Sequence, residues 1–170
     1  MDSVDLNVLR SVLDWRRAGQ RVVLYSVVQT WGSAPRPPGA MLALREDGMV
    51  IGSVSGGCIE DDLISRLQDG RLQVRDEVQL VTYGVTQEEA ARFGLPCGGT
   101  LRLTEEWVGD EQWVAELLQR CEDHQLVARE LDLKSGAVSL HPASRGDQVS
   151  FDGQTLRTIY GPRWRLLLDR

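Results

Sequence analysis

Glycine constrains the fold of this chain more than any other residue type, because its 17 glycines gather at particular places. The segment Gly52-Ser53-Val54-Ser55-Gly56-Gly57-Cys58-Ile59-Glu60 joins a predicted strand to a predicted helix. A second glycine pair, Gly98 and Gly99, directly follows Cys97. Because glycine has no Cβ atom, a ligand or another chain segment can approach the backbone closely at both places.

The length and charge of the chain limit the classes of protein to which it can belong. Its 170 residues are enough for one hydrophobic core, since a domain of this size buries roughly 70% of its unfolded surface. The 25 acidic residues outnumber the 19 basic residues, which gives a net charge of -6. Nucleic-acid binding requires a basic surface and is therefore not expected, although one small phosphate can still bind at a helix end.

Apolar periodicity predicts an α+β fold, with a mixed sheet of hairpins and strand–helix units flanked by three to four helices in a single domain. An Asp-Gly turn at Asp47-Gly48 favours a hairpin. Helices are predicted at 3–18, between Gly57 and Gly70, at 87–93 and after Asp110, and strands at 22–30, 41–45, 49–53, 73–83 and 100–107, with hairpins in the remainder.

The amino terminus and the cysteines indicate a cytoplasmic protein. The first five residues are acidic where a secretory signal would be basic, and no apolar stretch follows them. The longest apolar stretch, Val22 to Val28, is too short to span a membrane. The three cysteines are an odd number without a Cys-x-x-Cys pair, which favours free thiols in a reducing compartment.

The Gly52 to Glu60 segment can hold an anion, because backbone N–H groups at a helix amino terminus lack intrahelical partners and face the positive end of the helix dipole. It matches neither the dinucleotide fingerprint nor the nucleotide P-loop. Arg36 lies in a loop stiffened by three prolines, and its guanidinium fork matches phosphate oxygens. A plain structural turn and a solvated arginine remain the alternatives.

Cys58 is the first candidate for chemistry, because a helix amino terminus favours the nucleophilic and metal-ligating thiolate. Acidic neighbours at positions 60 to 62 oppose this effect, and a small buried apolar residue is the alternative. Cys97 lies in a second glycine-rich setting, whereas Cys121 falls in the apolar stripe of its helix. The two histidines, His124 and His141, have no metal-ligand spacing.

Three motifs in order resemble the XdhC/CoxI family of xanthine dehydrogenase accessory factors over about the first two thirds of the chain. They are Thr30 to Gly39, Gly52 to Glu60, and Tyr83-Gly84 through Leu95-Pro96-Cys97-Gly98-Gly99-Thr100. The resemblance implies maturation of molybdenum hydroxylases: binding of the molybdenum cofactor (molybdopterin), support for exchange of an oxo for a sulfido ligand, and delivery to the apoenzyme. It implies a cofactor-binding chaperone more than an enzyme.

The resemblance also implies which residues contact the cofactor. Cys58 is the first candidate to contact molybdenum and Cys97 the second, with Arg36 for the phosphate. The full implied set is Ser33, Arg36, Ser53, Ser55, Gly56, Gly57, Cys58, Glu60, Cys97, Gly98 and Gly99. The implied partners are the molybdenum hydroxylase apoenzyme, a cysteine desulfurase, and either a separate Rossmann-domain chain or a second copy of this chain.

The resemblance predicts an XdhC/CoxI-like domain at residues 1–160 and a closing strand at 161–170. The closing segment resembles the entry to a Rossmann-like domain, but the chain stops before any G-x-G-x-x-G turn. Two functions of other classes stay open. One is a thiol enzyme or persulfide carrier that uses Cys58, and the other is an assembly module that docks on a partner chain without binding cofactor.

Overall fold

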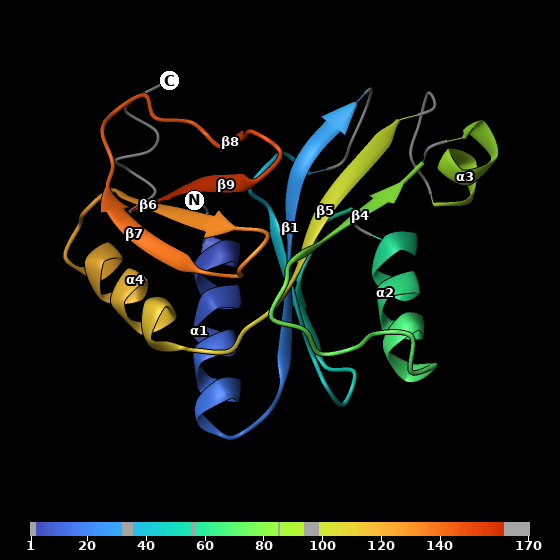
Figure 1. Cartoon of the computed structure of the whole chain (residues 1–170), viewed down its shortest axis with the longest axis horizontal. Coiled ribbons are helices and arrows are strands. Elements are labelled where there is room, and N and C mark those ends of the chain that lie inside the picture. Colours follow the sequence, from blue (N-terminus) through green and yellow to red (C-terminus); the bar gives the residue numbers. More distant parts are fainter. Residues whose placement is uncertain (1–2, 32–35, 56, 85, 94–98, 162–170) are drawn as a thin grey trace.

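A computed structural model describes residues 3–31, 36–55, 57–84, 86–93 and 99–161. Four helices and two sheets make up this described part of the chain (Figure 1). The elements are α1 (Ser3–Arg17), β1 (Val22–Trp31), β2 (Met41–Arg45), β3 (Val50–Gly52), α2 (Cys58–Gln68), β4 (Gln79–Tyr83), α3 (Gln87–Arg92), β5 (Thr100–Trp107), α4 (Gln112–Glu122), β6 (Val127–Asp132), β7 (Val138–Pro142), β8 (Ser150–Phe151) and β9 (Thr155–Tyr160).

The strands divide between a five-stranded sheet in the order β3-β2-β1-β5-β4 and a four-stranded sheet in the order β7-β6-β9-β8. The predicted α+β class with its helices in one domain is confirmed. All pairings between described strands are antiparallel, and the strands form two sheets where the sequence had suggested one mixed sheet. Short hairpins join β2 to β3, β6 to β7 and β8 to β9, and connections of this length can only join antiparallel neighbours.

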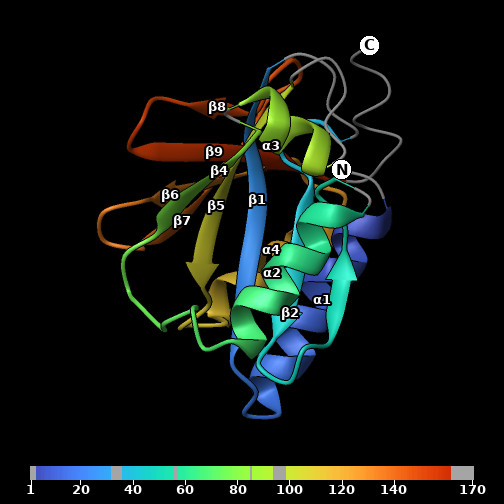
Figure 2. The same cartoon turned by 90° about the vertical axis from the view of Figure 1, so that its right-hand side faces the viewer.

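Strand β1 lies at the centre of the larger sheet and is buried on both faces. Val22 and Leu24 pack with helices α1 and α4, whereas Val23 and Tyr25 pack against α2 on the other face. All four side chains have no exposed surface. Burial on both faces explains why this strand is a continuous apolar run and does not alternate. Figure 2 looks onto the second face, with α2 and α3 in front of the sheet.

A β-bulge in β1 connects the two sheets. The register between β1 and β5 shifts between Val27 and Gln29, which leaves Val28 as an extra residue. Val28 packs in a third apolar cluster with Leu131 and Leu156, which belong to the four-stranded sheet. The bulge therefore supplies a side chain from the central strand of one sheet to the apolar cluster of the other.

A buried ion pair makes a second connection between the sheets. The Arg129 guanidinium of β6 donates to both carboxylate oxygens of Glu106 in β5 and stacks on the ring of Trp113 at 4.1 Å from its centroid. Arg129 is fully buried and Glu106 nearly so. Burying either charge alone is costly, so each side chain requires the other in place.

Aspartates close the turns of the four-stranded sheet. Asp132 and Asp152 each accept hydrogen bonds from the backbone N–H groups two and three residues further on. Asp147 accepts one from the N–H of Ser144. These backbone donors hold the pKa of all three carboxyls below the usual aspartate value.

The strand predicted at 73–83 is shorter in the structure, where β4 spans Gln79–Tyr83. The backbone N–H of Val78 donates to the carbonyl of Leu133 and so pairs with the second sheet instead of β5. Val74, which precedes the strand, is exposed. The alternating pattern of this segment therefore extends beyond the residues that find a strand partner.

Gly52 at the end of β3 is a position where only glycine fits. Its φ is +90°, and a Cβ atom there would lie 2.7 Å from Cγ2 of Val8 and against the carbonyl oxygen of Met41. We expect Gly52→Ala to lower the free energy of unfolding by about 3 kcal/mol, through backbone strain and overpacking. Urea denaturation measures this loss.

Gly48 provides the matched control, because it has a φ of +94° but no atom within 4 Å of an added Cβ. Gly48→Ala should therefore cost only the backbone strain, about 1 kcal/mol. Equal losses in the two variants would show that packing between β3 and α1 does not require glycine.

Candidate functional site

One end of the five-stranded sheet brings together the described ends of all three sequence motifs (Figure 1). In the antiparallel order, β1, β3 and β4 end on this side, and β2 and β5 begin there. The pairing of Trp31 with Thr100 and of Tyr83 with Leu101 marks this end. The connections that carry the three motifs therefore leave the same end of the sheet, although they are far apart in sequence.

The segment between β3 and α2 is organised by the carboxylate of Glu60. Oε1 accepts hydrogen bonds from the N–H groups of Val54 and Ser55, at 2.9 and 2.8 Å, and from the Ser53 hydroxyl at 3.2 Å. Oε2 accepts from the Ser55 hydroxyl at 2.6 Å and from the Gly57 N–H at 2.8 Å. Five donors from one short segment thus converge on a single side chain.

These contacts change what the glycine-rich segment offers to a ligand. The N–H groups of Val54, Ser55 and Gly57 were candidates for binding an external anion, and in the structure they bind the protein's own carboxylate. A phosphate could use these three donors only by displacing Glu60. Gly57 and Glu60 are the N-cap and N3 residues of α2, and because glycine has no side chain, only the bond from the Gly57 N–H to the Glu60 carboxylate forms, which is half of a capping box.

Cys58 is the first residue of α2, and its side chain is exposed. Ser53 is half-buried and Ser55 is buried, in agreement with their hydrogen bonds to Glu60. Cys121 is buried in α4, and burial raises the pKa of its thiol to about 11. Of the two cysteines in the described residues, only Cys58 therefore presents its sulfur to a ligand.

Arg36, which precedes β2, is only partly exposed and faces α1. Its guanidinium lies 3.7 Å from Oδ1 of Asp5, and the exposed fraction of its side chain is 24%. Its Nε atom is buried without a hydrogen-bond partner among the described residues. The structure thus places this arginine against the fold, close to the turn of α1 that carries Val8, the neighbour of Gly52.

Four residues of the predicted set, Ser33, Gly56, Cys97 and Gly98, lie outside the described residues. Gly99 is described and buried, directly before β5. The hydroxyl of the next residue, Thr100, donates to the carbonyl of Gly84 at 3.0 Å. This bond ties the start of β5 to the residue that follows β4, at the same end of the sheet.

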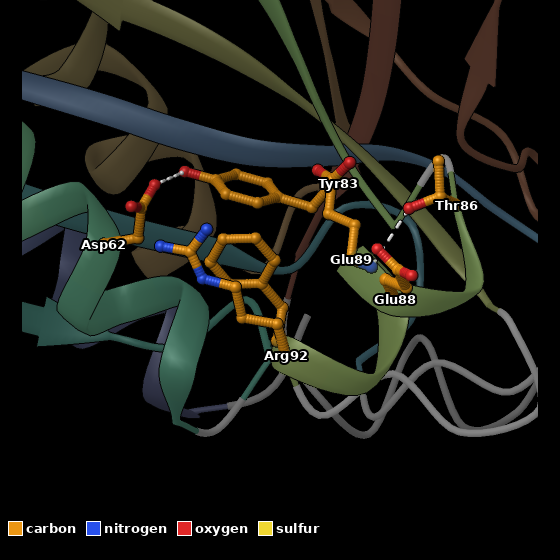
Figure 3. A pocket seen from close by; sticks show the side chains of 7 residues that line it. Asp62, Tyr83, Thr86, Glu88, Glu89 and Arg92 are labelled. Carbon is orange, nitrogen blue, oxygen red and sulfur yellow. Dashed lines mark hydrogen bonds between the residues drawn. The ribbon is translucent and has the colours of Figure 1, made fainter.

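A pocket of about 460 Å³ opens between α2 and α3 beside this end of the sheet (Figure 3). The hydroxyl of Tyr83 donates to Oδ2 of Asp62 at 2.6 Å and crosses from β4 to α2. Burial, together with the bond to Asp62, raises the pKa of Tyr83 above its usual value. The pocket is lined by Asp62, Tyr83, Thr86, Glu88, Glu89, Arg92 and Phe93.

The sequence did not predict this pocket, because no local pattern relates its two walls. Asp62 and Tyr83 are 21 residues apart. On the α3 side, the Thr86 hydroxyl accepts the backbone N–H of Glu89 at 3.1 Å, as is typical of a threonine at a helix N-cap. Cys58 precedes Asp62 by one helical turn, so the two side chains are neighbours on the surface of α2.

Two features are absent from the described residues. No group of three or more His, Cys, Asp or Glu side chains in the described part of the chain is arranged to hold a metal ion. Among the same residues, no helix is both long enough and apolar enough to cross a membrane.

Two curated proteins resemble the chain in sequence. It is 30% identical over 163 residues to the molybdenum cofactor insertion chaperone PaoD of Escherichia coli. The matched region covers 91% of this chain and 50% of that protein. The chain is also 30% identical over 95 residues to a Bacillus subtilis protein described as a probable subunit of xanthine dehydrogenase, covering 55% of this chain and 28% of the relative. The chain thus spans half the length, or less, of these relatives.

A solved structure has the same fold. A crystal structure of a xanthine dehydrogenase from Bacillus halodurans superimposes with a TM-score of 0.66 at 22% identity, over 93% of this chain and 53% of that one. Residues 15–84, which include the Arg36 loop and the Gly52 to Glu60 segment, match the model of the XdhC and CoxI family. Residues 15–84 of the chain therefore carry the sequence signature of the XdhC and CoxI family.

Proposed function

We propose that this chain is an accessory protein that binds the molybdenum cofactor and assists its sulfuration and its insertion into a molybdenum hydroxylase. Its relationship to a cofactor insertion chaperone and to a probable xanthine dehydrogenase subunit supports the class of process. In this role the cofactor is cargo that the chain receives and releases. Release requires the apoenzyme as a partner, and sulfuration requires a sulfur donor such as a cysteine desulfurase.

The observation that carries the proposal is the position of Cys58. Its exposed thiol begins α2 at the end of the sheet where the described ends of the three family motifs meet. Sulfur is a soft ligand and suits a soft metal centre such as molybdenum bound to a dithiolene. The thiol is also within one helical turn of a pocket, so a bound cofactor could have its metal at Cys58 and still contact protein elsewhere.

Arg36 supplies the group that a cofactor phosphate needs. The guanidinium has five N–H donors in a planar fork, and its described ion pair with Asp5 involves only NH2. Because Arg36 packs against α1, its side chain has fewer rotamers and loses less conformational entropy when it binds a phosphate. The Glu60 carboxylate already occupies the donors of the glycine segment, which makes Arg36 the better candidate for the phosphate.

Cofactor binding should depend on both side chains. After anaerobic incubation with molybdenum cofactor, we expect the wild-type chain to retain molybdenum and pterin together. Cys58→Ser replaces the soft ligand and should weaken retention of the metal about tenfold. Arg36→Lys keeps the charge but loses the fork, and should weaken retention of the whole cofactor severalfold. Metal analysis and pterin fluorescence of the re-isolated protein measure the two parts separately.

Ser65→Ala and Arg71→Lys are matched controls, because both residues are exposed and lie outside the three motifs. Cys97→Ala tests the second predicted thiol in the same assay. Full retention of cofactor and full activation of the client enzyme by the Cys58 and Cys97 variants would contradict the roles of the thiols. If the wild-type chain bound neither molybdenum nor pterin, the assembly-module alternative would replace the cofactor-binding proposal.

Glu60 should act by positioning Cys58 and not by binding cofactor directly. Glu60→Gln places an amide N–H₂ among five donors, so at least one donor loses its acceptor. We expect a loss of about 2 kcal/mol in unfolding free energy. Backbone amide exchange at Val54, Ser55 and Gly57 should accelerate more than exchange elsewhere.

Glu116→Gln is the control for Glu60→Gln, because Glu116 forms an exposed ion pair with Arg120 on α4. Such surface ion pairs contribute about 0.5 kcal/mol to the free energy of unfolding, so the melting temperature of this variant should be close to that of the wild type. Unchanged amide exchange in the Gly52 to Glu60 segment of Glu60→Gln would show that the carboxylate does not organise it.

A further inference from the structure

The pocket between α2 and α3 lies beside Cys58, and its lining indicates which part of a ligand it can hold. Its volume of about 460 Å³ is within the usual range for sites that bind small organic molecules. One wall is aromatic, since the rings of Tyr83 and Phe93 meet edge to face with centroids 4.8 Å apart. The pocket can therefore receive a flat ring of modest size.

Most of the polar groups of the pocket are hydrogen-bond acceptors. The carboxylates of Asp62, Glu88 and Glu89 line it together with one guanidinium, that of Arg92. Figure 3 shows Glu88 and Glu89 on α3 beside Thr86, with Arg92 extending toward Asp62 on the opposite side. An excess of carboxylates repels an anion, so the pocket is unsuited to the phosphate of a ligand and suited to a group rich in N–H donors.

A pterin ring has this chemistry. Its pyrimidine edge presents a ring N–H next to an amino group, and these two donors match the two oxygens of one carboxylate, as a guanidinium does. Its two fused rings are flat and can pack against Tyr83 or Phe93. A metal ion is a poorer candidate, because the described carboxylates do not form a group arranged to hold one.

We infer that the pocket between α2 and α3 receives the pterin ring of the molybdenum cofactor, an inference that rests on the proposed function. The donor edge of the ring faces the carboxylates, and the phosphate stays outside the acidic pocket. Asp62 is fixed for this contact by the hydroxyl of Tyr83. Because Cys58 and Asp62 are neighbours on α2, one ligand can contact the pocket and the thiol together.

The test uses 6-hydroxymethylpterin, a fluorescent pterin that carries neither molybdenum nor phosphate. We expect it to bind the wild-type chain, and expect Asp62→Asn and Glu89→Gln each to weaken binding about tenfold. The amide introduced by Asp62→Asn keeps an oxygen that can accept the Tyr83 hydroxyl, so the fold should be preserved. Phe93→Leu should weaken binding by loss of ring packing. Fluorescence titration measures the affinities, and thermal unfolding checks each variant.

Glu122→Gln is the matched control, because Glu122 lines a different pocket, of about 400 Å³, between α1 and α4. It should change pterin affinity less than twofold. The inference would be overturned if the wild type bound no free pterin, or if the Asp62 and Glu89 variants bound it as tightly as the wild type and the control.

Parallel titrations with intact molybdenum cofactor separate this inference from the proposed function. Cofactor retention that depends on Cys58 but not on Asp62 or Glu89 would overturn the pterin pocket and leave the proposed function standing. Pterin binding that depends on Asp62 and Glu89, without any retention of intact cofactor, would show that the pocket binds a pterin but would overturn the proposed function and with it the assignment of that pterin to the molybdenum cofactor.

Discussion

Residues 22–28 of strand β1 are buried on both faces of the sheet, and the rest of the fold is arranged to cover them. A strand buried on both faces needs helices on both sides of its sheet, and α1 with α4 on one side and α2 on the other supply them. To reach the second face, the chain must cross the end of the sheet between β3 and α2. The glycine-rich segment with Ser53, Ser55 and Gly57 makes this crossing, which explains why its conformation is so tightly fixed by Glu60.

Charged groups of opposite sign lie on the two sides of this crossing segment, at the same end of the sheet. Arg36 faces α1 on one side, and the carboxylates of the pocket lie between α2 and α3 on the other. Cys58 lies where the crossing segment enters α2. A ligand with an anionic group, a soft metal and a donor-rich ring would find a complementary group for each part, and under the proposed function the molybdenum cofactor supplies these three parts.

Local patterns in the sequence were sufficient for most elements of the fold. Gly19 and Gly70 follow α1 and α2 with positive φ, and the Asp47-Gly48 turn closes the β2–β3 hairpin, as their residue types predict. Pairings between distant segments were not predictable in this way. The contact between the two sheets depends on Val28 at the bulge and on the buried pair Arg129–Glu106, and neither has a local signature. The same holds for the Tyr83–Asp62 bond that forms the pocket.

The aspartates that close the turns of the four-stranded sheet make those turns sensitive to acid. Their folded-state pKa values lie below the ordinary value of 3.8, so each contributes stability above that pH and loses it as the pH falls through the lower value. The larger sheet has such a turn at Asp47, where the Arg45 side chain and the backbone N–H of Met49 lower the pKa of the carboxyl to about 2. Among the described residues, acid therefore loosens turns in both sheets, three in the four-stranded sheet and one in the larger sheet, while the apolar contacts on the two faces of β1 persist.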